Sequence, residues 1–367
     1  MTRSLPGAAA PHRRRRLPQP VLGVGGRLNA RLLPALPDWA KRLMSGGRAV
    51  VIDGNTLDPT VQALLMLTRL SGVPGLVLDD DVAASRRNMY DTCMAFGGQR
   101  VPVRVDELSI PGPANPIGAR HYRPAGTDPA PVLVYFHGGG YVMGDLDCYD
   151  ALCRLICRDA GIHVISVDYR LAPEHKAPAA IDDCYAAYRW VTQRAGELGV
   201  QPGRIAVGGD SAGGGLAAVV SRLARDEGGP APVLQLLLYP WTDMRTPSRS
   251  RTLFADGFVL CQHDIDWCAD QYLDGSGIED TDPRVAPLRA KSLAGLPPAL
   301  VFTGGFDPLR DEGNRYAAAM AEAGVPVDLR QLGSLMHAFA SFNGLGGDCS
   351  RGIADMVSAL TAHLRRG

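Results

Sequence analysis

Short apolar segments alternate with amphipathic segments along most of this chain, beginning near Val103. Strands are predicted at Val103–Ile110, Ala119–Arg123, Val132–Phe136, His163–Val167, Arg204–Val207, Val233–Leu238, Ala299–Phe302 and Val327–Leu332. Helices are predicted at about Asp147–Asp159, Ala179–Arg194, Ser211–Arg225, Glu312–Ala323 and Ile353–Arg365. This alternation is typical of a mostly parallel sheet with helices on both faces. We therefore predict an α/β fold with eight strands, in which the first two form an antiparallel edge.

Two regions interrupt the alternation and suggest how the chain is divided. Residues 1–100 contain helical patterns only, and residues 243–290 contain helices and loops although they lie between two predicted strands. We expect residues 101–242 and 291–367 to form the core. Residues 1–100 would then supply a tail and cap helices, and residues 243–290 a cap insertion over the sheet.

Charge and cysteine content exclude several classes of function. The 38 Lys and Arg residues balance the 38 Asp and Glu residues, so the chain lacks the basic excess typical of nucleic-acid binding. The eight cysteines contain no Cys-x-x-Cys pair, which argues against a zinc site or a disulfide scaffold. We expect reduced thiols, a cytoplasmic location and a small uncharged substrate.

The N-terminal segment is basic but does not have the pattern of a secretory signal. Four arginines occupy positions 13–16, and the prolines and glycines that follow prevent an apolar run from forming. No segment of the chain approaches the ~18 apolar residues of a membrane span. We expect a soluble protein with a basic tail. Apolar residues within Arg27–Met44 leave weak peripheral membrane contact through the N-terminal region as an alternative.

A glycine-flanked serine lies where a predicted strand meets a predicted helix, in Gly209-Asp210-Ser211-Ala212-Gly213. A sharp turn at this junction strains the serine backbone and presents its hydroxyl above the sheet, beside a helix N-terminus that favours negative charge. A phosphate-binding loop would need Lys and then Ser or Thr after the glycines, and Leu216 follows them instead. The pattern predicts that Ser211 is a nucleophile.

A second glycine-rich segment, His137-Gly138-Gly139-Gly140-Tyr141, directly follows a predicted strand. Acyl transfer requires hydrogen-bond donors directed at the oxyanion of the tetrahedral intermediate, and backbone N–H groups of small residues can approach it closely. Gly138 and Gly139, together with the N–H of Ala212, are the predicted donors. His137 is interpreted as a residue that shapes the loop.

A nucleophilic serine needs a general base, and the base needs an orienting carboxylate. On such a sheet the acid and then the histidine follow the serine along the chain. Three histidines follow Ser211, and only His337 comes after the last predicted strand and before the terminal helix. Asp307, just beyond a strand and its Gly304-Gly305 turn, is the predicted acid. Asp311 is the less favoured alternative, because it falls where helices are commonly capped.

With these residues in view, the chain resembles the hormone-sensitive lipase group of α/β-hydrolases, also called bacterial family IV esterases, and in particular its mycobacterial lipase and esterase members. The matching segments, in family order, are His137–Tyr141, Asp168–Glu174, Gly209–Gly214, Tyr239-Pro240, Asp307–Asp311 and His337–Phe339. The resemblance implies a serine carboxylesterase for short- to medium-chain acyl esters that works through an acyl-enzyme without metal or cofactor. It also implies that Gly138, Gly139 and Ala212 shape the oxyanion hole, that a cap covers the acyl pocket, and that the protein forms a homodimer.

Two other functions use the same fold. An amidase or arylacetamide-deacetylase-like hydrolase would have the same reacting residues and a different pocket. A ligand-binding receptor that had lost catalysis would be expected to lack the histidine, and His337 is present. No chemistry is assigned to Asp168–Glu174, and Asp210 is interpreted as a turn residue.

Overall fold

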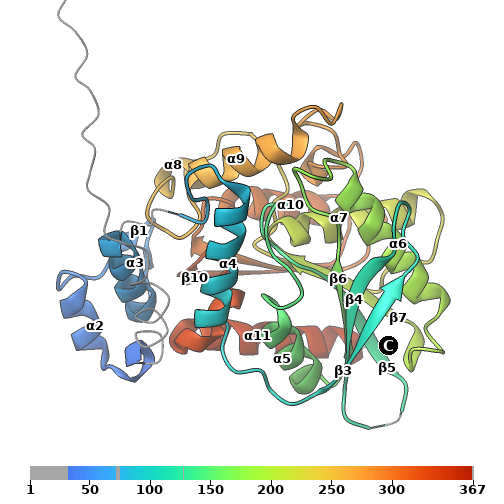
Figure 1. Cartoon of the computed structure of the whole chain (residues 1–367), viewed down its shortest axis with the longest axis horizontal. Coiled ribbons are helices and arrows are strands. Elements are labelled where there is room, and N and C mark those ends of the chain that lie inside the picture. Colours follow the sequence, from blue (N-terminus) through green and yellow to red (C-terminus); the bar gives the residue numbers. More distant parts are fainter. Residues whose placement is uncertain (1–31, 72–74, 127, 366–367) are drawn as a thin grey trace, which may run out of the picture.

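The computed structural model describes residues 32–71, 75–126 and 128–365, and an eight-stranded sheet forms its centre (Figure 1). The strands are β3 (Arg104–Ile110), β4 (Ile117–Arg123), β5 (Ala130–Phe136), β6 (His163–Asp168), β7 (Val200–Asp210), β8 (Gln235–Leu238), β9 (Ala299–Phe306) and β10 (Val327–Met336). Their order is β10-β9-β8-β7-β5-β6-β4-β3. Pairs β3–β4 and β4–β6 are antiparallel and the other pairs are parallel. The predicted α/β fold with an antiparallel edge is confirmed.

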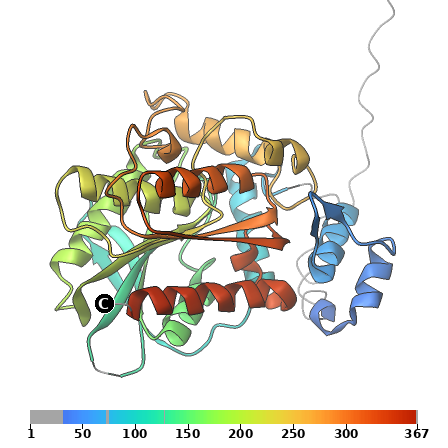
Figure 2. The same ribbon diagram turned by 180° about the vertical axis from the view of Figure 1, so that it is seen from behind.

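Helices cover both faces of this sheet, as the alternation predicts. They are α5 (Asp150–Ala160), α6 (Ala179–Gln193), α7 (Ala212–Asp226), α10 (Arg310–Glu322) and α11 (Gly347–Arg365). Helices α5 and α11 pack together on one face, whereas α6, α7 and α10 contact the other. Figure 2 shows α10 and α11 on opposite sides of the strands. Strand β9, which lies between β10 and β8, is buried along its whole length, because both of its faces are covered.

Strands β9 and β10 extend further than the sequence pattern predicts, and both extensions reach the site. Strand β9 continues through Gly304 and Gly305 to Phe306, and β10 continues past an irregularity to Met336. A Cβ atom on Gly305 would lie 2.1 Å from the backbone oxygen of Gly333, so glycine allows the two strands to remain close. The predicted glycine turn is therefore part of the strand.

The N-terminal region contains more than the predicted helices. Its helical elements are η1 (Leu33–Ala35), α2 (Asp38–Met44), α3 (Pro59–Ser71) and α4 (Val82–Phe96). Strands β1 (Val51–Ile52) and β2 (Asn55–Thr56) form a hairpin in addition. Its turn is Asp53-Gly54, with φ of 52° and 75°, a pair that suits a two-residue hairpin loop. The predicted basic tail lies outside the described residues.

The segment between β8 and β9 contacts the N-terminal region, and one of these contacts is made by a buried carboxylate. The segment contains α8 (Arg249–Leu253), α9 (Gln262–Leu273) and η2 (Pro287–Arg289). A further short helix, η3 (Phe339–Leu345), lies outside this segment and follows β10. Asp264, in the first turn of α9, accepts hydrogen bonds from the backbone N–H of Leu76 at 3.2 Å and of Val77 at 2.9 Å. These two regions therefore meet, whereas the predicted division into core and cap stays a prediction.

The state of the cysteines and the hydropathy of the helices bear on two of the sequence predictions. All eight cysteines are free and buried, in agreement with their interpretation as reduced thiols. Across the described ranges, every helix is too short or too polar to cross a membrane.

A buried pair of histidines lies on neighbouring strands of the sheet. His121 Nε2 lies 2.9 Å from His163 Nδ1, and His163 Nε2 lies 3.0 Å from the carbonyl oxygen of Gly199. A carbonyl only accepts, so His163 Nε2 carries its proton and His121 Nε2 donates to His163 Nδ1. Burial lowers the pKa of His121 to about 3, and burial also lowers the pKa of His163. Both rings are therefore neutral in the folded protein at pH 7.

We expect this pair to make folding sensitive to mild acid. Because the pKa of His121 is lower in the folded chain than in the unfolded chain, its stabilising contribution is present above pH ~6.5 and is lost as pH falls toward 3. Between pH 6.5 and 4.5 the unfolding free energy of the wild type should fall with decreasing pH. In His121→Gln the slope of this fall should be smaller by up to about 1.4 kcal/mol per pH unit. Urea denaturation across this range measures it. His263→Gln, which removes an exposed imidazole, is the control. An equally steep decline in His121→Gln would contradict the prediction.

Candidate active site

Ser211 lies directly after β7, at the N-terminus of α7, in a strained backbone conformation. Its φ of 53° and ψ of −120° are rare for a residue with a side chain. A Cβ atom on Gly209 would lie 2.4 Å from the carbonyl oxygen of Phe136, and one on Gly213 would lie 2.0 Å from the same oxygen. The glycines on either side of the serine therefore let the chain turn sharply against β5, as the pentapeptide predicts.

The side chains of Ser211, His337 and Asp307 form a continuous hydrogen-bonded line. His337 Nε2 lies 2.9 Å from Ser211 Oγ, and His337 Nδ1 lies 2.9 Å from Asp307 Oδ2. All three residues are buried. The carboxylate can only accept, so Nδ1 carries a proton and Nε2 can take the proton of the serine hydroxyl. The three residues predicted from widely separated segments thus lie together.

The competing candidates lie elsewhere. His263 is exposed and pairs with Asp80 at 3.0 Å, and His363 lies in α11, 3.6 Å from Asp328. Asp311 accepts a hydrogen bond from the backbone N–H of Ser250 at 2.8 Å. These contacts place each alternative with a partner other than Ser211 or His337.

The contacts of the glycine-rich loop after β5 correct one predicted oxyanion donor. The N–H of Gly138 donates to Asp210 Oδ1 at 2.8 Å, so it is already used and does not point at the serine. Among the hydrogen bonds of the described residues, none uses the N–H of Gly139 or Gly140. Both of these glycines line the same pocket as Ser211. The prediction missed Gly140, because three consecutive glycines look equivalent in sequence.

Aromatic side chains hold this loop. The ring of His137 stacks against Tyr169, with 4.3 Å between ring centroids, and against Tyr149, at 5.6 Å. Tyr169 Oη donates to the carbonyl oxygen of His137 at 2.7 Å. The N–H of Ala172 donates to the carbonyl oxygen of Tyr141 at 2.9 Å. His137 therefore shapes the loop, and the Asp168–Glu174 segment, to which the sequence assigned no role, supports it.

An apolar pocket of about 40 Å³ adjoins the serine and the histidine. Its apolar side chains come from the core and from both regions that interrupt the alternation: Leu76, Met89, Met143, Trp241, Leu260, Ile265, Cys268 and Leu309. Such a wall suits the hydrocarbon part of a small ligand. The arrangement can position an uncharged carbonyl compound beside Ser211.

Comparison with known proteins agrees with this geometry. Residues 133–341 match a family model described as the alpha/beta hydrolase fold. The carboxylic ester hydrolase LipN of Mycobacterium tuberculosis is 55% identical over 379 residues, which cover all of both chains. The ethyl acetate hydrolase of Pseudomonas putida is 35% identical over 320 residues, covering 84% of this chain and all of that one.

A solved structure extends the likeness to three dimensions. A thermostable esterase from Pseudomonas putida superposes with a TM-score of 0.81 at 33% identity, covering 86% of this chain and all of that one. The family match spans the strands that carry the nucleophile loop, the acid and the histidine. The chain therefore belongs to the α/β-hydrolase fold family, in its hormone-sensitive lipase group, and is a carboxylic ester hydrolase.

Proposed function

We propose that this chain is a serine carboxylesterase that hydrolyses short- to medium-chain acyl esters through an acyl-enzyme intermediate. Ser211 is the nucleophile, His337 the general base and acid, and Asp307 the residue that orients the imidazole. The observation that carries the proposal is the unbroken hydrogen-bonded line from Asp307 through His337 to Ser211. No step of this mechanism requires a metal or a cofactor.

The reaction proceeds in two halves. Ser211 Oγ attacks the ester carbonyl carbon while His337 Nε2 takes the hydroxyl proton. The N–H groups of Gly139, Gly140 and Ala212 then stabilise the oxyanion, with the N-terminus of α7 adding its favourable potential. His337 returns the proton to the leaving alcohol, and water attacks the acyl-enzyme by the same route in reverse.

The small apolar pocket supports a preference for short acyl groups within this class. The free space beside the reacting groups is only about 40 Å³. The similar protein from Pseudomonas putida is named for ethyl acetate, an ester with a two-carbon acyl group. Acetyl to butyryl esters are thus the proposed fast substrates.

The flanking regions and the partners are proposals of the same kind. Residues 32–100 and 243–290 both contribute pocket side chains, which supports their role as a cap. Trp39 and Leu43, one helical turn apart on α2, are 70% and 68% exposed and support weak membrane contact. A homodimer stays a prediction.

A chain-length series of 4-nitrophenyl esters tests the proposed function. The acetate and butyrate should be hydrolysed with a burst of nitrophenol equal to the enzyme concentration, because the acyl-enzyme accumulates when deacylation is slower. Hydrolysis that leaves no acyl group on the Ser211 peptide in mass spectrometry would contradict a covalent route.

The same series tests the pocket wall. Met89→Ala removes a side chain that lines the pocket and should raise the octanoate-to-acetate ratio of kcat/KM by about tenfold or more. Met94→Ala, on the same helix and outside the pocket lining, is the matched control and should leave the ratio unchanged. Equal ratios in the wild type and in Met89→Ala would show that Met89 does not limit the acyl chain.

A further inference from the structure

A buried carboxylate lies immediately before the nucleophile, although the proposed reaction has no step for it. Asp210, the last residue of β7, is 1% exposed. Its Oδ1 accepts hydrogen bonds from Tyr135 Oη at 2.7 Å and from the N–H of Gly138 at 2.8 Å. Its Oδ2 accepts from Tyr149 Oη at 3.1 Å. Three donors from two separate segments therefore converge on one side chain.

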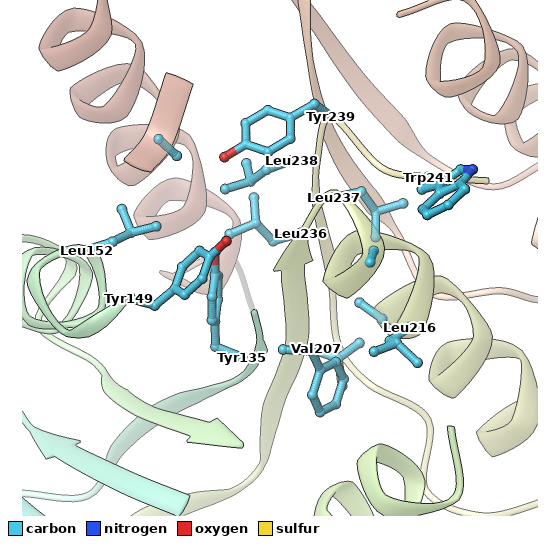
Figure 3. Close-up of a cluster of buried hydrophobic side chains, with 14 of the residues drawn as sticks. Tyr135, Tyr149, Leu152, Val207, Leu216, Leu236, Leu237, Leu238, Tyr239 and Trp241 are labelled. Atoms are coloured by element: carbon cyan, nitrogen blue, oxygen red, sulfur yellow. The ribbon is translucent and has the colours of Figure 1, made fainter. Parts of the chain in front are cut away.

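The tyrosine hydroxyls fix the position of this carboxylate. In Figure 3 the hydroxyl groups of Tyr135 and Tyr149 point toward the same place, beside Leu236. Burial raises the pKa of the Asp210 carboxyl above its usual range, while the hydrogen bonds from Tyr135, Gly138 and Tyr149 oppose that rise. A buried acid without such donors would be costly, so this arrangement is built for a carboxylate.

The contact with Gly138 is one half of a clamp on a single peptide group. Asp210 accepts the N–H of the peptide that joins His137 to Gly138, and Tyr169 donates to its carbonyl oxygen at 2.7 Å. The plane of that peptide is thereby held from both sides. The next two peptide N–H groups, those of Gly139 and Gly140, are the donors assigned to the oxyanion.

The packing around Gly138 shows how closely the carboxylate approaches the loop. A Cβ atom at this position would lie 2.4 Å from Asp210 Oδ2 and 2.8 Å from Tyr149 Oη. No side chain fits there unless the carboxylate moves. Asp210 and Gly138 therefore form one contact that ties the nucleophile turn to the oxyanion loop.

We propose that Asp210 is a positioning residue that orients the oxyanion donors by anchoring the peptide N–H of Gly138. The inference rests on the proposed acyl transfer at Ser211. Asp210 acts through the loop, so its loss should affect the transition state more than the bound ester. Oxyanion donors are typically worth about 100- to 1000-fold in kcat, and their alignment depends on this anchor.

The first test compares two substitutions at position 210. Asp210→Ala should lower kcat for 4-nitrophenyl acetate by about 100-fold or more, with KM changed less than about threefold. Asp210→Asn should retain at least about a tenth of kcat, because its amide oxygen can still accept from Gly138 and Tyr135 while its NH₂ group faces the Tyr149 oxygen. A kcat in Asp210→Ala within about threefold of wild type, or equal losses in Ala and Asn, would overturn the proposal.

An inhibitor that forms a tetrahedral adduct with the serine distinguishes a loss of oxyanion-donor alignment from a general loss of structure. Phenylboronic acid binds the serine as an analogue of the tetrahedral intermediate, so its inhibition constant should rise in proportion to the loss of kcat. Asp58→Ala removes another buried carboxylate that accepts backbone N–H groups, at the start of α3, and is the matched control. It should lower thermal stability without changing kcat or boronate affinity. A boronate affinity unchanged in Asp210→Ala would contradict the inference.

A double-mutant cycle covers the case in which Asp210→Ala does not fold. Gly138→Ala should displace the carboxylate and lower kcat, and adding Asp210→Asn to it should cost less than the two separate effects combined. Fully additive losses would overturn the shared contact. If Ser211→Ala is inactive while the variants at 210 and 138 behave as wild type, only this inference fails. If Ser211→Ala is fully active, the proposed function itself fails.

Discussion

Ser211→Ala is expected to lower kcat for 4-nitrophenyl acetate by about 10⁵- to 10⁶-fold, to a level set by the remaining donors and binding groups. The hydroxyl is the atom that forms the covalent bond, and it lies within hydrogen-bond distance of the only base in the line, His337. Removing it takes away the acyl-enzyme route while leaving the pocket in place. The initial rates of the wild type and of Ser211→Ala, measured at the same protein concentration, give the size of the effect.

Ser221→Ala is the matched control for this result. Ser221 is also a buried serine of α7, and its hydroxyl donates to the carbonyl oxygen of Ala217 at 2.9 Å. Its substitution should leave kcat unchanged, because this hydroxyl serves only its own helix. Circular dichroism of both variants establishes that they are folded. Residual activity above about a tenth of wild type in pure Ser211→Ala would remove Ser211 from the mechanism.

The sequence allowed the fold and the three reacting side chains to be predicted, because both depend on local patterns and chain order. Apolar runs of strand length mark buried parallel strands, and the carboxyl ends of such strands meet at one edge of the sheet. Ser211, Asp307 and His337 each follow a strand, so their meeting could be anticipated before any distance was known.

The roles of the individual glycines in the oxyanion loop could not be predicted from the sequence, because the geometry of the loop depends on contacts between distant residues. Gly138, Gly139 and Gly140 are identical in type, and only the bond between Gly138 and Asp210 separates their roles. Gly138 and Asp210 are 72 positions apart in the sequence. The other two hydrogen-bond donors to Asp210, Tyr135 and Tyr149, come from different elements. Asp210 therefore looked like a turn residue in sequence.

The lengths of β9 and β10 were underestimated for a related reason. Glycine normally indicates a turn, yet Gly304 and Gly305 remain in the strand because the neighbouring chain at Gly333 leaves no room for a side chain. Sequence pattern records the absence of a side chain and gives no indication of what occupies the space. The extension matters for function, since it places Asp307 and His337 directly at the ends of adjacent strands.

Asp307→Asn is expected to lower kcat by about 10,000-fold while the fold and KM change little. The carboxylate holds a proton on His337 Nδ1, which leaves Nε2 free to accept the serine proton. An asparagine can turn its NH₂ group toward Nδ1, which favours the tautomer with the proton on Nε2, facing Ser211 Oγ. That imidazole cannot act as the base.

Asp311→Asn provides the comparison that decides between the two candidate acids. Asp311 lies in the first turn of α10 and contacts Ser250 and Arg310, so its substitution should alter stability slightly and leave kcat within about threefold of wild type. The two variants differ by four positions in sequence and carry the same chemical change. A large loss in Asp311→Asn with little loss in Asp307→Asn would reverse the assignment, because only the carboxylate that orients the imidazole can produce a tautomer effect.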